Sequence, residues 1–290
     1  MIKTIVIPDV HGRTFWKDVL SSFPPEKYPD IDIIFLGDYL DPYAHEGITR
    51  GDAITVFKEI IAAARADKRI ILLLGNHDLS YYDSNMSTSR IDRINWGRIH
   101  ELFMSNNDLF LFAHEHTYSD KTYVFTHAGI NNEWLKYVKK WAEYHLDKAT
   151  EDGKALEKRD EDFFLDCVDF DRHKDNVVKL LNSMKAENSQ EFFRFHAMYS
   201  ISIYRGGYVD FASPIWSDIN DFKVDDGERI YNKCYQVFAH TITYPNGQYS
   251  YEVGDKFAML DASQGFTIDE NGKIETVDAS LSEKKLVSLR

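Results

Sequence analysis

The sequence has little cysteine, no long apolar run and no excess of positive charge. Its 290 residues include two cysteines, Cys167 and Cys234, which are too few for a disulfide framework and lack the C-x-x-C spacing of a structural zinc site. No stretch approaches the roughly 20 apolar residues of a membrane-spanning helix. The apolar start, Ile2–Ile7, is too short for a signal peptide. We therefore expect a cytoplasmic protein without a membrane segment.

The charge balance is acidic, with 34 lysines and arginines against 47 aspartates and glutamates, a net charge of −13. An acidic chain has no general attraction for a phosphate backbone or an anionic membrane. We therefore expect no non-specific nucleic-acid binding and no membrane binding, although a locally positive pocket stays compatible with this composition. Hydrophobic residues make up 43% and charged residues 28% of the chain, which is typical of a folded globular protein.

Short apolar segments alternate with helical patterns in the N-terminal part of the chain. Ile2–Ile7, Ile31–Leu36 and Ile70–Leu74 have the composition of buried parallel strands. Thr14–Ser22 and Asp52–Ala66 lie between them, and the second of these has apolar residues at helical spacing. This order predicts an α/β fold in which parallel strands are buried between helices.

The middle of the chain has strand character on both sides of a charged segment. We expect a strand at Tyr123–Thr126, with a hairpin partner formed from Leu109–Ala113, and another strand at Tyr235–Ala239. Residues 133–200 are charged and poor in glycine and proline, which predicts a helical insertion or cap.

The end of the chain predicts one more hairpin and a loose tail. Lys256–Leu260 and Gly265–Ile268 have the pattern of a final hairpin, and residues 281–290 have that of a frayed tail. We expect a single domain over residues 1–280 that carries the helical insertion at about 133–200.

Polar side chains of metal-ligand type follow most of the predicted strands. They are Asp9, His11, Asp38, Asn76, His127 and His240. Because ligands bind outside the carboxyl ends of the strands in open α/β sheets, these side chains are expected at one edge. Carboxylate oxygen and imidazole nitrogen suit Mn, Fe or Zn. Six ligands are more than a single zinc ion needs. They are enough for two ions about 3.5–4 Å apart, and Asp38 is the natural ligand to bridge the two.

The ordered motifs resemble the calcineurin-like metallophosphoesterase superfamily. The D-x-H motif lies at Asp9, G-D at Asp38 and G-N-H-D at Asn76, and a later His127 and a final Ala239-His240 follow. Further details are similar to the phosphoprotein phosphatase and symmetrical diadenosine tetraphosphatase branch. These are Asp41, the His127-Ala-Gly turn, Trp216-Ser-Asp and the closing segment around Met259-Leu-Asp.

The resemblance implies a four-layer αββα sandwich and hydrolysis of phosphoric esters by a hydroxide that bridges two divalent ions. It assigns Asp9 and His11 to the first ion, Asp38 to both, and Asn76, His127 and His240 to the second. His77 becomes the general acid for the leaving group, and Asp41 orients it. Manganese is the ion expected to support activity in vitro. The implied substrate is a phosphorylated small molecule, a nucleotide or a phosphoprotein.

The chain departs from the family pattern at the phosphate-gripping arginine. Where that branch has D-R-G, this chain has Asp41-Pro42-Tyr43, so the arginine must come from elsewhere. Arg13, Arg205 and Arg229 are the candidates that the sequence offers. The missing arginine weakens the case for phosphoprotein substrates and leaves hydrolysis of phosphomonoesters or phosphodiesters in place.

Several alternatives stay open at this stage. His114 and His116 resemble a G-H-x-H motif, but they precede His127, which indicates a hairpin or a cleft rim. Asp78 fits a helix cap or a support for the ligands, Tyr81 and Tyr82 are possible substrate contacts, and Trp216 fits packing. Two rival functions remain: hydrolysis of dinucleoside polyphosphates, and a catalytically silent scaffold that binds a partner through residues 133–200. The oligomeric state is left open.

Overall fold

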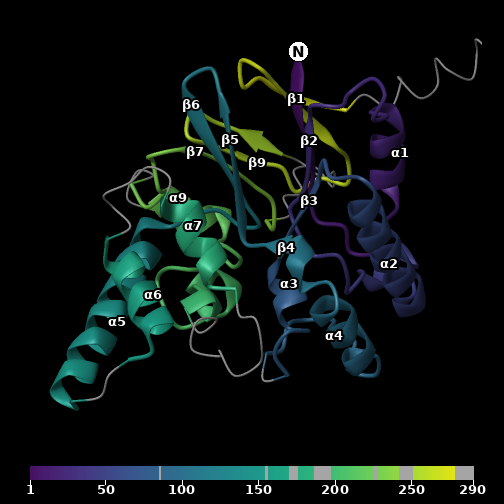
Figure 1. Cartoon of the computed structure of the whole chain (residues 1–290). Helices are drawn as coiled ribbons and strands as arrows, with labels where there is room; N and C mark the ends of the chain where they lie inside the picture. The colour runs from purple at the N-terminus through teal and green to yellow at the C-terminus, as the bar shows by residue number, and fades with distance from the viewer. Residues whose placement is uncertain are drawn as a thin grey trace, which may run out of the picture.

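Two β-sheets and a set of helices make up the computed structural model, which describes residues 1–84, 86–153, 156–169, 176–185, 197–224, 228–241 and 251–277. Sheet A has six strands in the order β11-β10-β1-β2-β3-β4. Sheet B has five strands in the order β5-β6-β7-β9-β8. The two sheets lie beside each other, with helices on the outside (Figure 1).

Sheet A has a parallel half and an antiparallel half. Strands β1 to β4 are parallel, while β10 runs antiparallel to both β1 and β11. The strands are β1 (Ile2–Ile7), β2 (Asp32–Phe35), β3 (Ile70–Leu73), β4 (Phe110–Leu111), β10 (Phe266–Asp269) and β11 (Ile274–Thr276). The parallel arrangement predicted for the first three segments is confirmed.

Sheet B combines a parallel centre with antiparallel edges. Strands β6, β7 and β9 are parallel, and β5 and β8 pair antiparallel at the two edges. The strands are β5 (Ala113–Tyr118), β6 (Lys121–Thr126), β7 (Tyr235–Phe238), β8 (Glu252–Val253) and β9 (Phe257–Met259).

Apolar side chains fill the space between the sheets and cover both outer faces. Val6 and Ile34 of sheet A share a buried cluster with Phe125 and Val237 of sheet B. Burial of such side chains stabilises each one by about 1.5–3 kcal/mol relative to exposure. Since successive strand residues point to opposite faces, the neighbours Ile5 and Ile33 face the helices instead.

Helices complete the outer layers. Trp16 and Phe57 of the helices α1 and α2 belong to the buried cluster on the outer face of sheet A, and Phe103 of α4 packs on Phe57 with ring centroids 4.6 Å apart. On sheet B, Phe222 of α9 packs on Phe238 at 5.5 Å. The bounds are α1 (Phe15–Ser22), α2 (Arg50–Ala66), α3 (Asn76–Leu79), α4 (Trp96–Met104) and α9 (Ile219–Lys223). The expected four layers are therefore present.

The predicted helical segment is also present where the structure describes it. It contains α5 (Asn132–Glu151), α6 (Lys158–Asp169) and α7 (Asn176–Ser183), which form a group beside the sandwich (Figure 1). The Asn182 side chain anchors α7, because its amide accepts from the backbone N–H groups of Phe112 and Ala113 and donates to the carbonyl of Ala113. The insertion is thus tied to the start of β5.

Two expectations about strand pairing are wrong. The segments Lys256–Leu260 and Gly265–Ile268 do not pair, because β9 lies in sheet B whereas β10 lies in sheet A; the final hairpin is β10–β11. Likewise, β4 within Leu109–Ala113 is the fourth parallel strand of sheet A, and the hairpin partner of β6 is β5. The predicted tail 281–290 lies outside the described residues.

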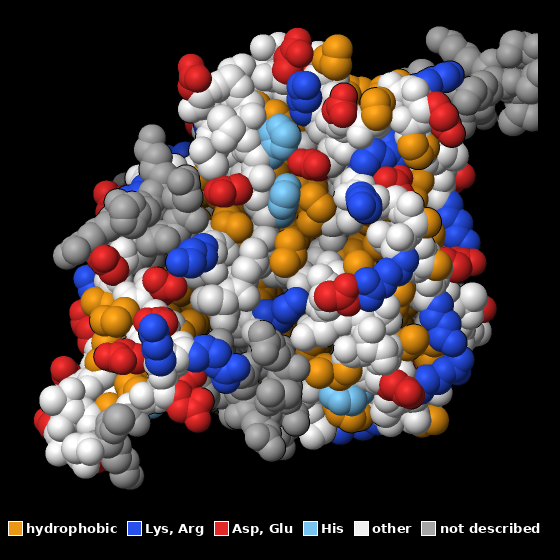
Figure 2. Space-filling model, viewed as in Figure 1, with side chains coloured by type: hydrophobic (Ala, Val, Ile, Leu, Met, Phe, Trp, Pro, Cys, Tyr) orange, Lys and Arg blue, Asp and Glu red, His pale blue; other side chains and the backbone are white. Residues whose placement is uncertain are grey.

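Two surface features bear on partners. Among the described residues, the chain has no helix whose length and apolar character would let it cross a membrane. On the face shown in Figure 2, acidic and basic side chains are interspersed.

Candidate metal centre

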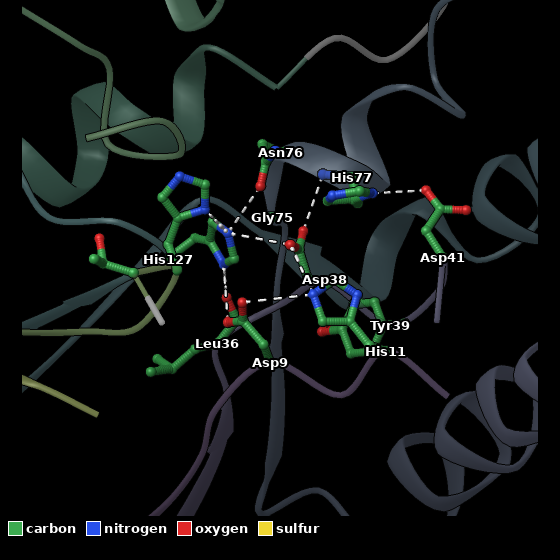
Figure 3. Close-up of polar contacts among 12 residues, drawn as sticks. Asp9, His11, Leu36, Asp38, Tyr39, Asp41, Gly75, Asn76, His77 and His127 are labelled. Carbon is green, nitrogen blue, oxygen red and sulfur yellow. Dashed lines mark hydrogen bonds and ion pairs between the residues drawn. The ribbon is translucent and has the colours of Figure 1, made fainter. Parts of the chain in front are cut away.

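The carboxyl ends of strands from both sheets converge on one site. Asp9 follows β1, Asp38 follows β2 and Asn76 follows β3, while His127 and His240 follow β6 and β7 of the other sheet. The side chains of Asp9, His11, Asp38, Asn76 and His127 point toward one another (Figure 3), and His240 Nδ1 lies 3.1 Å from His127 Nε2. All six are buried, with at most 7% of each exposed. The structure therefore brings together the full ligand set predicted from the sequence.

The ligands form two groups that share Asp38. The atoms of Asp9, His11 and Asp38 lie within 4.8 Å of one another, and so do those of Asp38, His127 and His240. Asp38 Oδ2 lies 3.6 Å from His11 Nε2 and 3.6 Å from His127 Nε2. A carboxylate at the junction of two such groups has the position of a bridging ligand.

Backbone carbonyls set which nitrogen of each ring faces the site. His11 Nδ1 donates to the carbonyl of Leu40 at 2.8 Å, and His127 Nδ1 donates to that of Leu36 at 2.8 Å. Because a carbonyl only accepts, Nδ1 carries the hydrogen in both rings. The Nε2 lone pairs therefore face the carboxylates, which is the usual arrangement of histidines that bind metal.

The centre gathers acceptors that lack donors. His127 Nε2 lies 3.1 Å from His240 Nδ1 and 3.2 Å from Asn76 Oδ1. In addition, Asp9 Oδ1 and His240 Nε2 are buried without a hydrogen-bond partner. Such atoms are costly to bury unless something positive compensates them. Oxygen and nitrogen donors arranged in this way fit divalent metal ions.

The charged forms of these residues are disfavoured by burial. Burial, with Asp38 as a further contribution, raises the pKa of Asp9 to about 7. Burial also raises the pKa of Asp38 and lowers the pKa of His127 below its usual value. Bound cations would offset the cost of the ionised carboxylates, so metal binding and carboxylate ionisation support each other.

We expect the Asp9 carboxyl to make the metal-free protein less stable as the pH rises. The folded state keeps a proton on Asp9 up to about pH 7, whereas an unfolded aspartate releases it near pH 4, at about 3.9. Because the folded state then binds more protons, the contribution of Asp9 to the free energy of unfolding falls between about pH 4 and pH 7.

The measurement is the difference in unfolding free energy between the wild type and Asp9→Asn, both freed of metal with a chelator. The subtraction is needed because the buried histidines, whose pKa values are lowered, titrate with the opposite sign. We expect the difference to fall from pH 4 to pH 7. A flat or rising difference would contradict this account of Asp9.

Several ligands lie on backbone that non-glycine residues rarely adopt. Positive φ angles occur at His11 (45°), Asp38 (52°) and His240 (68°), and also at Asp41 (59°). Each such residue costs of order 1–3 kcal/mol and is kept only where the surrounding structure imposes it. The strained backbone at these four positions reduces the stability of the fold, but it directs the four side chains toward the site.

Two glycines allow the β2 and β3 loops to approach closely. Gly37 has φ 110°, and a Cβ there would lie 2.9 Å from Gly75 Cα. A Cβ on Gly75 would overlap Asp38 Oδ1 and lie 2.7 Å from the Asp38 backbone nitrogen. Asp78 ties the loops together by accepting from the backbone N–H groups of Asp38 and Gly75, each at 2.8 Å. The predicted supporting role of Asp78 thus agrees with its contacts.

Gly75→Ala is expected to displace Asp38 and lower both metal content and activity. The added methyl group has no space beside the carboxylate, so either the carboxylate or the loop must move. Metal per chain and melting temperature are the measurements. Gly97→Ala is the control, since its Cβ meets nothing within 4 Å and it lies in α4, where alanine stabilises by about 0.5–1 kcal/mol. Full metal content in Gly75→Ala would show that the loops tolerate separation.

His77 lies beside the ligands and is held by a chain of hydrogen bonds. Its Nδ1 donates to Asp41 Oδ2 at 2.7 Å, and Asp41 Oδ1 accepts from the Tyr81 hydroxyl at 2.5 Å. The Tyr81 hydroxyl in turn accepts from the backbone N–H of Asp92 at 2.9 Å. These bonds leave His77 Nε2 free of Asp41; it lies 3.4 Å from Nη2 of Arg90, and both residues line the same pocket.

The tyrosines and the second histidine pair have roles other than substrate contact. Tyr81 and Tyr82, which the sequence offered as substrate contacts, are buried and do not line the pocket over the centre; Tyr81 binds Asp41 instead. His114 and His116 lie on β5, within 3.5 Å and 3.0 Å of Asp32 Oδ2. They are hairpin residues outside the metal ligands, as the motif order predicts.

A pocket of about 340 Å³ opens over the centre. Metal-type ligands form its floor, and Trp216 lies in its wall with its ring 6.0 Å from that of His240. Trp216 also packs against the main core, so the predicted packing role accounts for part of its position. Arg90 and Arg205 supply the positive charge of the wall.

Of the three arginines proposed from the sequence, only Arg205 lines this pocket. Arg13 pairs with Glu46 at 2.8 Å, and Arg229 pairs with Asp210 at 3.4 Å. Arg90 was missed because it lies in a loop without a motif. Its positive φ of 66° is a feature that no sequence pattern indicated.

Comparison with known proteins agrees with the geometry. The family model of the calcineurin-like phosphoesterases matches residues 2–244. Among solved structures, the chain is similar to a protein serine/threonine phosphatase of Saccharomyces cerevisiae with similarity to human phosphatase PP5, with 14% identity over 96% of this chain and 80% of that one and a TM-score of 0.46. The chain is also similar to a mutant cold-active protein tyrosine phosphatase. The identity is 13%, the match covers 96% of this chain and 81% of that one, and the TM-score is 0.37. No curated protein matches.

Proposed function

We propose that this chain hydrolyses phosphomonoesters with two divalent ions that share Asp38. The premise is its family: the chain belongs to the calcineurin-like phosphoesterases and is a metal-dependent phosphoesterase. The observation that carries the proposal is the pair of ligand groups with Asp38 in common. Asp9 and His11 would hold one ion, and Asn76, His127 and His240 the other. Mn, Fe and Zn all suit this donor set.

The ions would supply the nucleophile and neutralise charge, since paired divalent ions lower the pKa of a coordinated water and stabilise phosphate oxygens. The chain's own residues supply the remaining steps. His77 lines the pocket while Asp41 holds its Nδ1, so its Nε2 would donate a proton to the leaving oxygen. The carboxylate of Asp41 orients the ring for that transfer.

The complete ligand set argues against a catalytically silent scaffold. Buried carboxylates and histidines on strained backbone reduce stability. A scaffold that only binds a partner through the helical insertion has no need for them.

The substrate class is a phosphorylated small molecule, a nucleotide or a phosphoprotein.

The direct test is hydrolysis of p-nitrophenyl phosphate by protein purified without added metal, treated with chelator and then reloaded. We expect no turnover after chelation and recovery of turnover with Mn²⁺. Absence of turnover with each of Mn²⁺, Fe²⁺ and Zn²⁺, in protein whose metal content is restored, would overturn the proposed function.

A further inference from the structure

The position that carries the phosphate-gripping arginine in the resembled branch is occupied by Pro42. Among the described residues that line the pocket, two nevertheless carry guanidinium groups, Arg90 and Arg205. The two differ in what already binds them, and this difference decides which is available to a substrate.

Arg205 is committed to the protein. Its Nε lies 2.8 Å from the carboxylate of Asp218, and its Nη2 donates to the His240 carbonyl and the Thr241 hydroxyl, both at 3.1 Å. Its charge is therefore paired, and its hydrogen bonds hold the backbone of a metal ligand. Arg205 is a positioning residue for His240.

Arg90 is held differently. Its Nε donates to the backbone carbonyl of Asp41 at 2.9 Å, while its Nη1 and Nη2 make only long contacts of 3.4 Å, to Ser89 Oγ and His77 Nε2. Within the described part of the chain, no carboxylate lies at ion-pair distance from it. Its positive charge and the N–H groups of Nη1 and Nη2 thus remain available to an anion in the pocket.

Tyr43 gives Arg90 a rigid support. The guanidinium carbon of Arg90 lies 3.8 Å from the centroid of the Tyr43 ring, a cation–π contact that orients a planar group. Tyr43 itself packs edge-on against the ring of His11, with centroids 5.1 Å apart.

The two departures from D-R-G therefore compensate each other. Pro42 removes the expected arginine, and Tyr43, in the place of glycine, supplies the ring on which an arginine from another loop rests. Arg90 has a positive φ of 66°, a conformation that a non-glycine residue keeps only where the surrounding structure imposes it.

We propose that Arg90, supported by Tyr43, binds a non-bridging oxygen of the substrate phosphoryl group and favours phosphomonoesters over phosphodiesters. A monoester has three non-bridging oxygens and up to two negative charges, whereas a diester has two oxygens and one charge. If two ions engage two oxygens, only the monoester retains one for Arg90. This inference rests on the proposed function and names the residue that sets its substrate class.

The experiment compares p-nitrophenyl phosphate with bis(p-nitrophenyl) phosphate in Mn²⁺-loaded protein. Since a hydrogen bond to a charged group contributes about 1.5–3 kcal/mol, Arg90→Met is expected to lower kcat/KM for the monoester by about 10–100-fold. The diester value should change by less than about threefold. Arg90→Lys, which keeps the charge but loses the fork, should fall between, and Tyr43→Leu should reproduce part of the loss while Tyr43→Phe retains activity.

Arg98→Met, at an exposed position of α4 outside the pocket, is the matched control and should leave both substrates unaffected. Equal losses for monoester and diester in Arg90→Met would overturn the inference, since they indicate that Arg90 only positions Asp41 and His77. Selective monoester loss in Arg205→Met but not in Arg90→Met would also overturn it.

Binding of inorganic phosphate separates this inference from the proposed function. The shift in melting temperature that phosphate causes is measured with and without Mn²⁺. We expect Arg90→Met to reduce the phosphate-induced shift in melting temperature both with and without Mn²⁺. This expectation holds even if the protein hydrolyses neither ester. An unchanged shift refutes the role of Arg90, whereas absence of wild-type turnover with every metal refutes only the hydrolase proposal.

Discussion

Asp38→Asn is expected to lower kcat/KM for p-nitrophenyl phosphate by at least about 10³-fold and to remove both bound ions. Asp38 belongs to both ligand groups, and an amide brings no negative charge to offset two cations. Because Lewis-acid stabilisation by a metal is worth several kcal/mol, its loss corresponds to at least this factor. The side chain also accepts from the His77 backbone N–H at 2.9 Å, so the position of His77 is affected as well.

Asp32→Asn is the matched control. Asp32 begins β2, the strand that Asp38 follows, but its carboxylate contacts His114 and His116 and not the candidate metal ligands. We expect this variant to keep its metal and its turnover. If Asp38→Asn retained two tightly bound ions and full activity, Asp38 would not be the bridge. If both variants lost metal equally, the effect would lie in folding of β2 and not in ligation.

His77→Ala is expected to lower kcat by about 10²–10⁴-fold while the metal content stays unchanged, because general acid catalysis contributes this much. The ring is held by Asp41 and does not belong to either ligand group. Elemental analysis beside the steady-state assay checks both parts. His114→Ala, on β5 and outside the pocket, should leave both kcat and metal content intact.

The leaving group provides a second check on His77. A general acid matters most when the leaving oxygen is a poor leaving group, so the loss should be larger for an alkyl phosphate than for p-nitrophenyl phosphate. Loss of metal in His77→Ala, or equal losses for both esters, would contradict the role assigned to this residue.

The site could be predicted from the sequence because it depends on local rules. Parallel strands end at the same edge, so apolar segments followed by Asp9, Asp38 and Asn76 already place three ligands together. His127 and His240 required a second sheet, which the sequence indicated only through the order of the motifs. The structure confirms that β6 and β7 carry these two histidines to the same point.

The strand pairing near the C-terminus could not be predicted in this way. Residues 256–268 have two strand-like segments joined by a short turn-like connection, which locally favours a hairpin. Long-range contacts decide otherwise: Phe257–Met259 pairs with β7, and Phe266–Asp269 pairs with β1. The connection therefore crosses from one sheet to the other.

Arg90 could not be predicted for a related reason. Its position depends on a left-handed backbone conformation and on a ring from a loop 47 residues earlier, at Tyr43. Neither feature has a sequence pattern. Departures from a family motif, here Pro42 and Tyr43, are the positions at which compensating residues should be sought in the structure.

The measurement that tests the central claim most directly is the electron paramagnetic resonance spectrum of Mn²⁺-loaded protein, recorded beside its metal content. Two ions that share Asp38 would lie about 3.5–4 Å apart and would interact magnetically. The account predicts about two ions per chain and the spectrum of a spin-coupled pair, which Asp38→Asn would abolish. One ion per chain, or the spectrum of isolated Mn²⁺ at full loading, would contradict it.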